Sequence, residues 1–303
     1  MFALRYCLNR FAFFITLGCA ALLSACGSGS TFEPLNPTRV ISFGDGLSDL
    51  GNSATGGRFT VNDGSQNIWI ERVASSYGKT ITAQISGGLG YASGGSGVSA
   101  IAAQITAFLP GNIGKSDLLI IDAGVSELAA LATANPTDNA ALNAAAAASG
   151  RALAAQVLRL TNAGAKHVVI ANAPDLGRTP FASLQTRTVA LTAASRIFND
   201  SLKVTLANVT DNVLLIDNEA YVNSLANTPS NLGTGGTASV PACATATFTP
   251  VSTSTCTTTT LNISAGVTSA TYNLSLYADD RHLAPAAHRL LGDNAYNRIR
   301  ARW

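Results

Sequence analysis

Residues 40–49 read Val-Ile-Ser-Phe-Gly-Asp-Gly-Leu-Ser-Asp, a short apolar run that passes straight into a turn rich in glycine and aspartate. A run of this length that is apolar on both faces is typical of a strand buried in a parallel sheet, and we expect the strand at residues 40–43. Three later runs have the same character and predict strands at residues 118–121, 167–171 and 213–216. The four segments together predict a central, mostly parallel sheet.

Segments with helical periodicity separate these runs. Two groups of large apolar residues recur at helical spacing: Leu153, Val157 and Leu160, and then Phe198, Leu202 and Leu206. Gly164 follows the first group as a C-terminal cap, and a closing helix is expected after Leu283 with Pro285 in its first turn. Strand and helix signals that alternate in this way predict right-handed βαβ units and a three-layer α/β/α domain with helices on both faces of the sheet.

The composition fits one large domain and excludes some functions. Hydrophobic residues make up 47% of the chain, which is enough for a sizeable core. Charged residues make up only 12%, the net charge is +2, and no basic stripe alternates with aromatic residues, so we expect no nucleic-acid partner. The cysteines and histidines do not have the spacing of a zinc site, and we expect no metal.

The beginning of the chain has the organisation of an export signal. Arginines flank a polar stretch ahead of an apolar run at residues 11–23, which is too short for a permanent membrane helix of about 20 apolar residues. The run ends in Leu-Ser-Ala-Cys at residues 23–26, which resembles the lipobox of bacterial lipoproteins. The resemblance implies that residues 1–25 are removed and that Cys26 carries the acyl chains that bind the lipid bilayer. An ordinary secretory signal with a chance cysteine near the cut is the alternative.

A tether is expected between the lipid and the folded domain. Residues 26–38 are rich in Gly, Ser and Pro and have little to bury, whereas the domain is expected at residues 39–303. Gly27 and Ser28 follow the cysteine without an acidic residue. By the same lipoprotein resemblance, this favours a position in the cell envelope at the outer membrane, facing the periplasm or the cell surface.

Residues 223–271 interrupt the alternation of strands and helices. They are crowded with Thr, Ser and Gly, and we expect them to form an insertion on the surface. Cys243 and Cys256 lie in this segment and are the two cysteines that remain once the signal and the lipidated cysteine are set aside. In an oxidising compartment they should form a disulfide, which the chain-entropy model values at about 3 kcal/mol.

Glycine-rich and polar blocks follow several of the predicted strands, where an open α/β sheet places its reactive groups. The blocks are Gly-Asp-Gly-Leu-Ser-Asp at residues 44–49, with Gly51 and Asn52, then residues 91–97, 124–127 and 279–282. Together they resemble the SGNH, or GDSL, hydrolase family, and they occur in that family's order.

Residues 172–180 extend the likeness, which is closest to the branch that contains autotransporter esterases and lecithinase/haemolysin phospholipases. The resemblance implies a flavodoxin-like α/β/α fold, hydrolysis of carboxylic esters, and no organic cofactor.

The resemblance also assigns roles to individual residues. Asp279 and His282 match the aspartate and the histidine of a catalytic triad, and their spacing of three puts both on one turn. Gly46 stands at the nucleophile position, where the family has serine, and Ser126 stands where the family has the asparagine of the oxyanion hole. The N–H groups of Gly46 and Gly95 are the two backbone oxyanion donors that the resemblance implies.

Asp45, Asp49 and Asn52 belong to the first block and are expected to support it.

The missing nucleophile leaves three functions open. The first is an impaired esterase or lipase whose cleft still binds a small-molecule ester, a lipid or a glycan. The second is an active esterase that uses a water activated by His282 or a displaced serine, and the serines considered are Ser42, Ser48, Ser93 and Ser96. Ser48 is expected to point elsewhere, since a helix should begin there. The third is a structural envelope lipoprotein whose Thr-rich insertion mediates contacts.

Overall fold

The computed structural model describes residues 33–53, 55–65, 68–109, 111, 113–209, 211–243 and 253–303. The expected export signal, Cys26 and most of the expected tether lie outside these residues. The chain divides into a unit at Met1–Pro34 and a unit at Leu35–Trp303, and the described helices and strands belong to the second unit. In the part of the chain that is described, no helix combines the length and the apolar character that crossing a membrane requires.

Four parallel strands form the central sheet, in the order β1-β2-β3-β4. They are β1 (Val40–Gly44), β2 (Leu118–Asp122), β3 (His167–Ala171) and β4 (Val213–Ile216). The register pairs Gly44 with Asp122, and Asp122 with Ala171, so the first three strands end level with one another. All four predicted strands are confirmed, and β1 and β2 are each one residue longer than expected.

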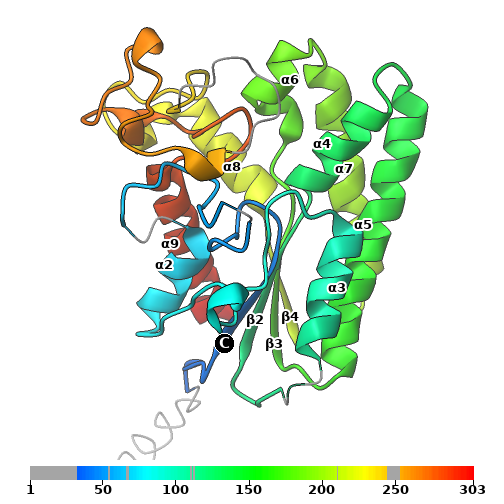
Figure 1. The fold of residues 1–303 in the computed structure, drawn as a ribbon. Helices are drawn as coiled ribbons and strands as arrows, with labels where there is room; N and C mark the ends of the chain where they lie inside the picture. The colour runs from blue at the N-terminus through cyan, green and yellow to red at the C-terminus, as the bar shows by residue number, and fades with distance from the viewer. Residues whose placement is uncertain are drawn as a thin grey trace, which may run out of the picture. The chain divides into compact units, whose positions relative to one another are not determined.

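Helices cover both faces of this sheet. The α-helices are α2 (Trp69–Ser76), α3 (Val98–Phe108), α4 (Val125–Ala134), α5 (Asn139–Asn162), α6 (Pro180–Leu184), α7 (Thr188–Thr205), α8 (Asn218–Asn227) and α9 (Pro285–Arg302). The short 3-10 helices are η2 (Gln84–Ser86), η3 (Leu176–Arg178), η4 (Pro229–Leu232), η5 (Thr253–Thr255), η6 (Ile263–Ala265) and η7 (Tyr272–Leu274). Figure 1 shows α3, α5 and α7 on one face of the sheet and α2 and α9 on the other. The predicted three-layer α/β/α fold is confirmed.

The helices begin, end and pack for local reasons that the sequence contains. Asp138 caps α5 by accepting a hydrogen bond from the N–H of Ala141, and Gly164 follows the helix with a φ of +102° that favours glycine. Gly150 lies where α5 meets α7, and a Cβ atom there would lie 2.2 Å from the carbonyl oxygen of Phe198. The small residue therefore lets the two helices pack closely. Pro285 begins α9 as its first residue.

A short segment extends the hydrogen bonding of β1 on its outer edge. The N–H of Ser42 donates to the carbonyl of Leu89, and the N–H of Tyr91 donates to the carbonyl of Ser42, which forms a parallel bridge. The chain therefore leaves β1, forms α2 on one face, returns beside β1, and forms α3 on the other face (Figure 1). Such a change of face leaves a crevice at the carboxyl ends of the strands.

The two ends of this unit meet at the opposite end of the sheet. The N–H of Leu35 donates to the carbonyl of Trp303 over 2.5 Å. The indole of Trp303 packs edge-on against the ring of His167, the first residue of β3, with ring centroids 5.0 Å apart. Both ends of the unit therefore lie at the amino ends of the strands.

The segment at residues 223–271 differs from the expected surface insertion in two ways. Its first residues, 223–227, belong to helix α8. Part of the rest is buried, since Cys243, Cys256 and Leu261 pack with Val61 in a second, small core. Most of its other described residues are exposed or half-buried, so the segment lies at the surface while a few of its apolar side chains are buried. The predicted disulfide between Cys243 and Cys256 is confirmed, with Cα atoms 6.0 Å apart.

Candidate active site

The turn that follows β1 is joined to the beginning of α4 by one buried carboxylate. Asp45 accepts hydrogen bonds from the N–H of Leu47 over 3.1 Å and from the N–H of Ser126 over 3.0 Å. Burial raises the pKa of Asp45, and these backbone hydrogen bonds oppose the rise. Asp45 thus holds the residue after it, Gly46, at a fixed position relative to Ser126.

Two other residues of the first block hold the glycine-rich loop. Asp49 accepts from the N–H groups of Asn52 and Gly94 with donor–acceptor distances of 2.6 and 2.8 Å. The side-chain amide of Asn52 donates to the carbonyls of Gly90 and Ala92 over 2.7 and 2.8 Å. Asp49 and Asn52 therefore place this loop beside the turn after β1.

Asp279 and His282 form a buried hydrogen-bonded pair. Nδ1 of His282 lies 2.7 Å from Oδ2 of Asp279, whose other oxygen accepts from the N–H of Arg281 and from that of His282. Burial opposes ionisation of Asp279, but the neighbouring imidazole and the N–H donors lower its pKa to about 2. Burial alone would lower the pKa of His282, whereas the Asp279 carboxylate holds it above its usual value. The carboxylate thus orients the imidazole and stabilises its protonated form.

The other nitrogen of this imidazole points at Gly46. A Cβ atom built on Gly46 would lie 2.5 Å from Nε2 and 2.9 Å from Cδ2 of His282. Nε2 is buried and has no hydrogen-bond partner among the described residues. The ring of Phe59 lies against both groups, with its centroid 4.9 Å from that of His282. The imidazole therefore occupies space that any side chain at residue 46 would need.

The backbone donors expected at Gly46 and Gly95 form no hydrogen bond with any described residue. Gly95 has a φ of +75°, which favours glycine, and a Cβ atom there would meet open space. Ser126 is half-buried beside the same space, and its own N–H is taken up by Asp45. The three expected oxyanion-site residues thus lie around one cleft or its edge.

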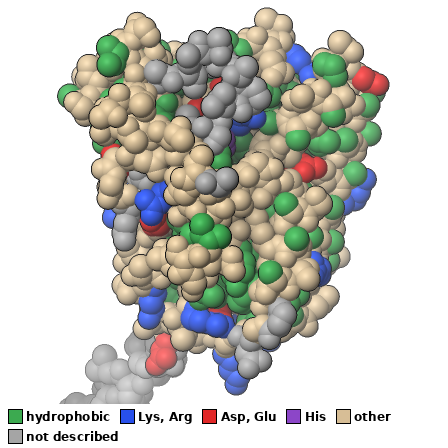
Figure 2. Space-filling model, viewed as in Figure 1, with side chains coloured by type: hydrophobic (Ala, Val, Ile, Leu, Met, Phe, Trp, Pro, Cys, Tyr) green, Lys and Arg blue, Asp and Glu red, His purple; other side chains and the backbone are tan. Residues whose placement is uncertain are grey.

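This cleft has a volume of about 480 Å³. Its lining combines small, hydroxyl-bearing and charged residues: Ser53, Thr55, Phe59, Gly94, Gly95, Ser126, Ala129, Ala130, Thr133, Ser254, Asp279, Asp280, Arg281 and His282. Arg281 forms two hydrogen bonds to Asp280, over 2.7 and 2.9 Å, so these two charges compensate each other. On the face shown in Figure 2, charged side chains are scattered and form no large patch.

Ser48 lies in the core and faces away from the imidazole. It donates to Oδ2 of Asp122 over 2.7 Å and accepts from the indole N–H of Trp69 over 3.0 Å. Burial, together with the charge of Asp45, raises the pKa of Asp122 to about 8. The expected beginning of a helix at Ser48 is wrong, because Asp45 and Ser48 close a turn and the next α-helix begins at Trp69.

The other serines considered as displaced nucleophiles have different environments. Ser42 is fully buried within β1, and Ser96 is nearly buried and accepts from the side-chain amide of Gln104 over 3.3 Å. Ser93 closes a turn by accepting from the N–H of Ser96 through its carbonyl. No hydrogen bond joins any of these side chains to His282 within the described residues.

The sequence did not single out Phe59, which lines the cleft, or Gln104, which binds Gly44 at the end of β1. The side chain of Gln104 accepts from the N–H of Gly44 and donates to its carbonyl, each over 2.9 Å. It thus takes the place of a neighbouring strand at the end of β1. Neither residue belongs to a pattern that marks a site, since Gln104 is one polar residue of α3 and Phe59 lies in a segment without periodicity. In the described part of the chain, no cluster of His, Cys, Asp or Glu could hold a metal ion.

Known proteins resemble this chain both in sequence and in fold. The model of a family described as GDSL-like lipase/acylhydrolase matches residues 40–295. Among solved structures, the chain is similar to a member of the lipolytic protein G-D-S-L family from Veillonella parvula, with 13% sequence identity and a TM-score of 0.47. That match covers 86% of this chain and 96% of the other. No curated protein matches the sequence.

Proposed function

Because this chain belongs to the GDSL-like lipase/acylhydrolase family, we propose that it binds an ester, lipid or glycan ligand in the family's cleft without forming an acyl-enzyme. We further propose that it does so in the cell envelope, held to lipid through Cys26. The proposal combines a retained acid–base pair with a missing nucleophile.

The observation that carries this proposal is the relation between Gly46 and His282. A triad histidine accepts a proton from the attacking serine, so its free nitrogen must point at the serine side chain. Here Nε2 of His282 points at a residue with no side chain, and the imidazole itself fills the position of a Cβ atom. A base is present, but the atom that would attack the ester is missing.

The expected loss of turnover is large. Removal of the serine of a catalytic triad costs roughly 10⁶-fold in turnover, and loss of one oxyanion donor costs about 10²- to 10³-fold. The family's asparagine is replaced by Ser126, whose side chain is shorter. The N–H groups of Gly46 and Gly95 remain available to an ester carbonyl. These features support binding of an ester with little or no hydrolysis.

A test separates binding from turnover. We expect wild-type protein to leave p-nitrophenyl acetate unhydrolysed above background and to remain unlabelled by a fluorophosphonate probe. Triacetin, a stable short-chain ester, should shift the NMR signals of the His282 ring, which is one of only three histidines in the chain. We expect Gly46→Ser to become labelled and to hydrolyse slowly, and Gly46→Ala is the control without a hydroxyl group. Absence of a shift in His282, together with absence of hydrolysis, would remove the cleft as the ligand site.

The Asp279–His282 pair favours a second candidate, which is slow hydrolysis by a water activated at Nε2. The raised pKa of His282 and its unpartnered Nε2 are properties that a general base requires. In this case wild-type protein should hydrolyse p-nitrophenyl acetate, His282→Ala should abolish the activity, and the fluorophosphonate should still not label the protein.

The envelope position has its own experiment. When the full chain is expressed in a bacterium supplied with labelled palmitate, we expect label in the wild-type protein and recovery in the membrane fraction. Cys26→Ser should remove the label and release the protein into the soluble periplasmic fraction. Label that persists in the variant would contradict anchoring through Cys26.

A further inference from the structure

One aromatic ring fills the space between the three parts of the site. A Cβ atom on Gly46 would lie 3.3 Å from Cγ of Phe59, and one on Gly94 would lie only 1.8 Å from its Cζ. The same ring packs on His282 with a centroid distance of 4.9 Å, and Phe59 is 5% exposed. Phe59 therefore bounds the space beside both the nucleophile position and the base.

Asn62 holds the short loop that carries this ring. Its Oδ1 accepts from the N–H of Arg58, and its Nδ2 donates to the carbonyl of Arg58, each over 3.0 Å. The same Nδ2 lies 3.0 Å from the carbonyl of Cys256, which also accepts from the backbone N–H of Asn62 over 2.8 Å. One side chain thus closes the loop around Phe59 and ties it to the disulfide-bonded segment.

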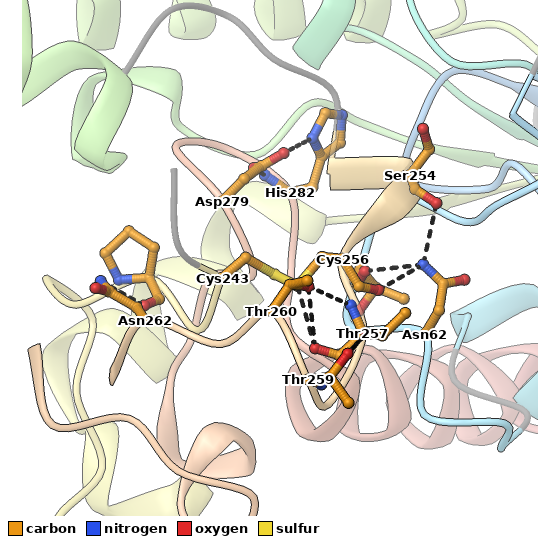
Figure 3. The surroundings of a disulfide bond; sticks show 12 residues. Asn62, Cys243, Ser254, Cys256, Thr257, Thr259, Thr260, Asn262, Asp279 and His282 are labelled. Carbon is orange, nitrogen blue, oxygen red and sulfur yellow. Dashed lines mark hydrogen bonds and ion pairs between the residues drawn. A yellow bond between two sulfur atoms is a disulfide. The ribbon is translucent and has the colours of Figure 1, made fainter. Parts of the chain in front are cut away.

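The disulfide continues this connection to the acid–base pair. The N–H of Cys243 donates to the carbonyl of Ala278 over 2.8 Å, and the N–H of Ala278 donates to the carbonyl of His282 over 2.7 Å. Figure 3 shows Asn62 beside Cys256, and Cys243 on the side of the disulfide nearer to Asp279. The disulfide therefore links the loop of Phe59 to the turn of His282, two segments far apart in the sequence.

We propose that Phe59 limits the size of the group that can lie beside Gly46 and Nε2 of His282. Asn62 and the Cys243–Cys256 disulfide are positioning residues that keep its ring there. In terms of the proposed function, the ligand group at this position is a short acyl group. Hydroxyl-bearing residues and two alanines line the adjoining cleft.

The experiment measures access to His282 and needs no ligand. Dimethyl and diethyl pyrocarbonate acylate neutral imidazole nitrogen and differ only in the size of their alkyl groups. The rate of acylation at each histidine is measured by peptide mass spectrometry. The pH is kept above the pKa of His282, so that the neutral imidazole dominates in every variant. His288 is fully buried and reports unfolding.

We expect wild-type His282 to react faster with the dimethyl than with the diethyl reagent, because the Phe59 ring excludes the larger one. In Phe59→Ala this preference should disappear, and the diethyl reagent should react on the order of tenfold faster, which is the discrimination that one methylene group allows. In Asn62→Ala and in the double variant Cys243→Ser/Cys256→Ser, the diethyl reagent should likewise react faster with His282 than it does in wild type. Asn262→Ala is the matched control, because Asn262 donates to the carbonyl of Pro241 beside the same small core, and no hydrogen bond joins its side chain to the loop of Phe59 within the described residues.

Each outcome decides one part of the inference. Unchanged rates in Phe59→Ala, with His288 still protected, would overturn the role of Phe59. A change in Phe59→Ala without a change in Asn62→Ala would overturn the positioning role. If Phe59→Ala exposes His288, Phe59→Leu keeps an apolar side chain and supplies the same comparison. Failure of triacetin to bind leaves these rates unaffected, so the two proposals fail separately.

Discussion

Addition of a single carbon at Gly46 should destabilise the protein, although glycine-to-alanine changes are often harmless. The new Cβ atom would lie 2.5 Å from Nε2 of His282, whereas carbon and nitrogen atoms in contact stay about 3.5 Å apart or more. The imidazole would have to retreat by about 1 Å. The hydrogen bond of 2.7 Å that Asp279 accepts from Nδ1 of His282, together with the ring of Phe59, opposes this movement. Overpacking of this kind costs about 1–3 kcal/mol.

The assay is a double-mutant cycle in the free energy of unfolding, measured with a chemical denaturant. Gly46→Ala and His282→Ala are made singly and together, and Gly46→Ser is added for comparison. We expect Gly46→Ala to cost about 1–3 kcal/mol in the wild-type background and much less in the His282→Ala background, where the space is open. Gly46→Ser should cost about as much as Gly46→Ala, and only the serine variant should gain hydrolysis.

One result would refute this reasoning. If Gly46→Ala is as stable as wild type and the coupling with His282→Ala is zero, the imidazole is not held in the space beside residue 46. The retained base would then stand at the usual distance from a nucleophile, and the low activity expected of Gly46→Ser would need another cause.

Three further predictions concern buried groups. The pKa of Asp122 is raised to about 8, above its value in the unfolded chain, so the stability that protonated Asp122 contributes is present at acid pH and is lost as the pH rises toward 8. The melting temperature of Asp122→Asn should therefore rise relative to that of wild type as the pH increases from 5 to 9. His288 is fully buried, and burial lowers its pKa to about 3, so the native state loses about 1.4 kcal/mol per pH unit as the pH falls from about 6.5 toward 3. His288→Leu should reduce this acid sensitivity, and equal slopes would contradict it. Removal of the disulfide in Cys243→Ser/Cys256→Ser should lower the free energy of unfolding by about 3 kcal/mol, and a loss near zero would show that the small core holds the segment unaided.

The layers of the fold could be predicted because they depend on local pattern. The strand at residues 167–171 and the strand at residues 213–216 are bounded as expected, since short apolar runs between polar segments have few other uses. The pairing of Asp279 with His282 also follows from local sequence, because a spacing of three brings both side chains to one turn.

The walls of the site could not be predicted in this way. Phe59 packs on the imidazole and its loop is bonded through Asn62 to a carbonyl at Cys256, and no local pattern connects residues so far apart. Ser48 was expected at the beginning of a helix, but the indole of Trp69 and the carboxyl of Asp122 draw its hydroxyl into the core. These contacts join segments that are distant in the sequence, so they depend on the tertiary fold.

The meeting of Leu35 with Trp303 has a practical consequence for experiments on this protein. Both ends of the described unit lie at the amino ends of the strands, whereas the cleft lies at their carboxyl ends. A fluorescent reporter, an affinity tag or a sensor surface attached at residue 35 or at residue 303 therefore leaves the ligand cleft unobstructed. A linker of a few residues between the two ends would also give a circularly permuted chain, with new termini opened in an exposed loop.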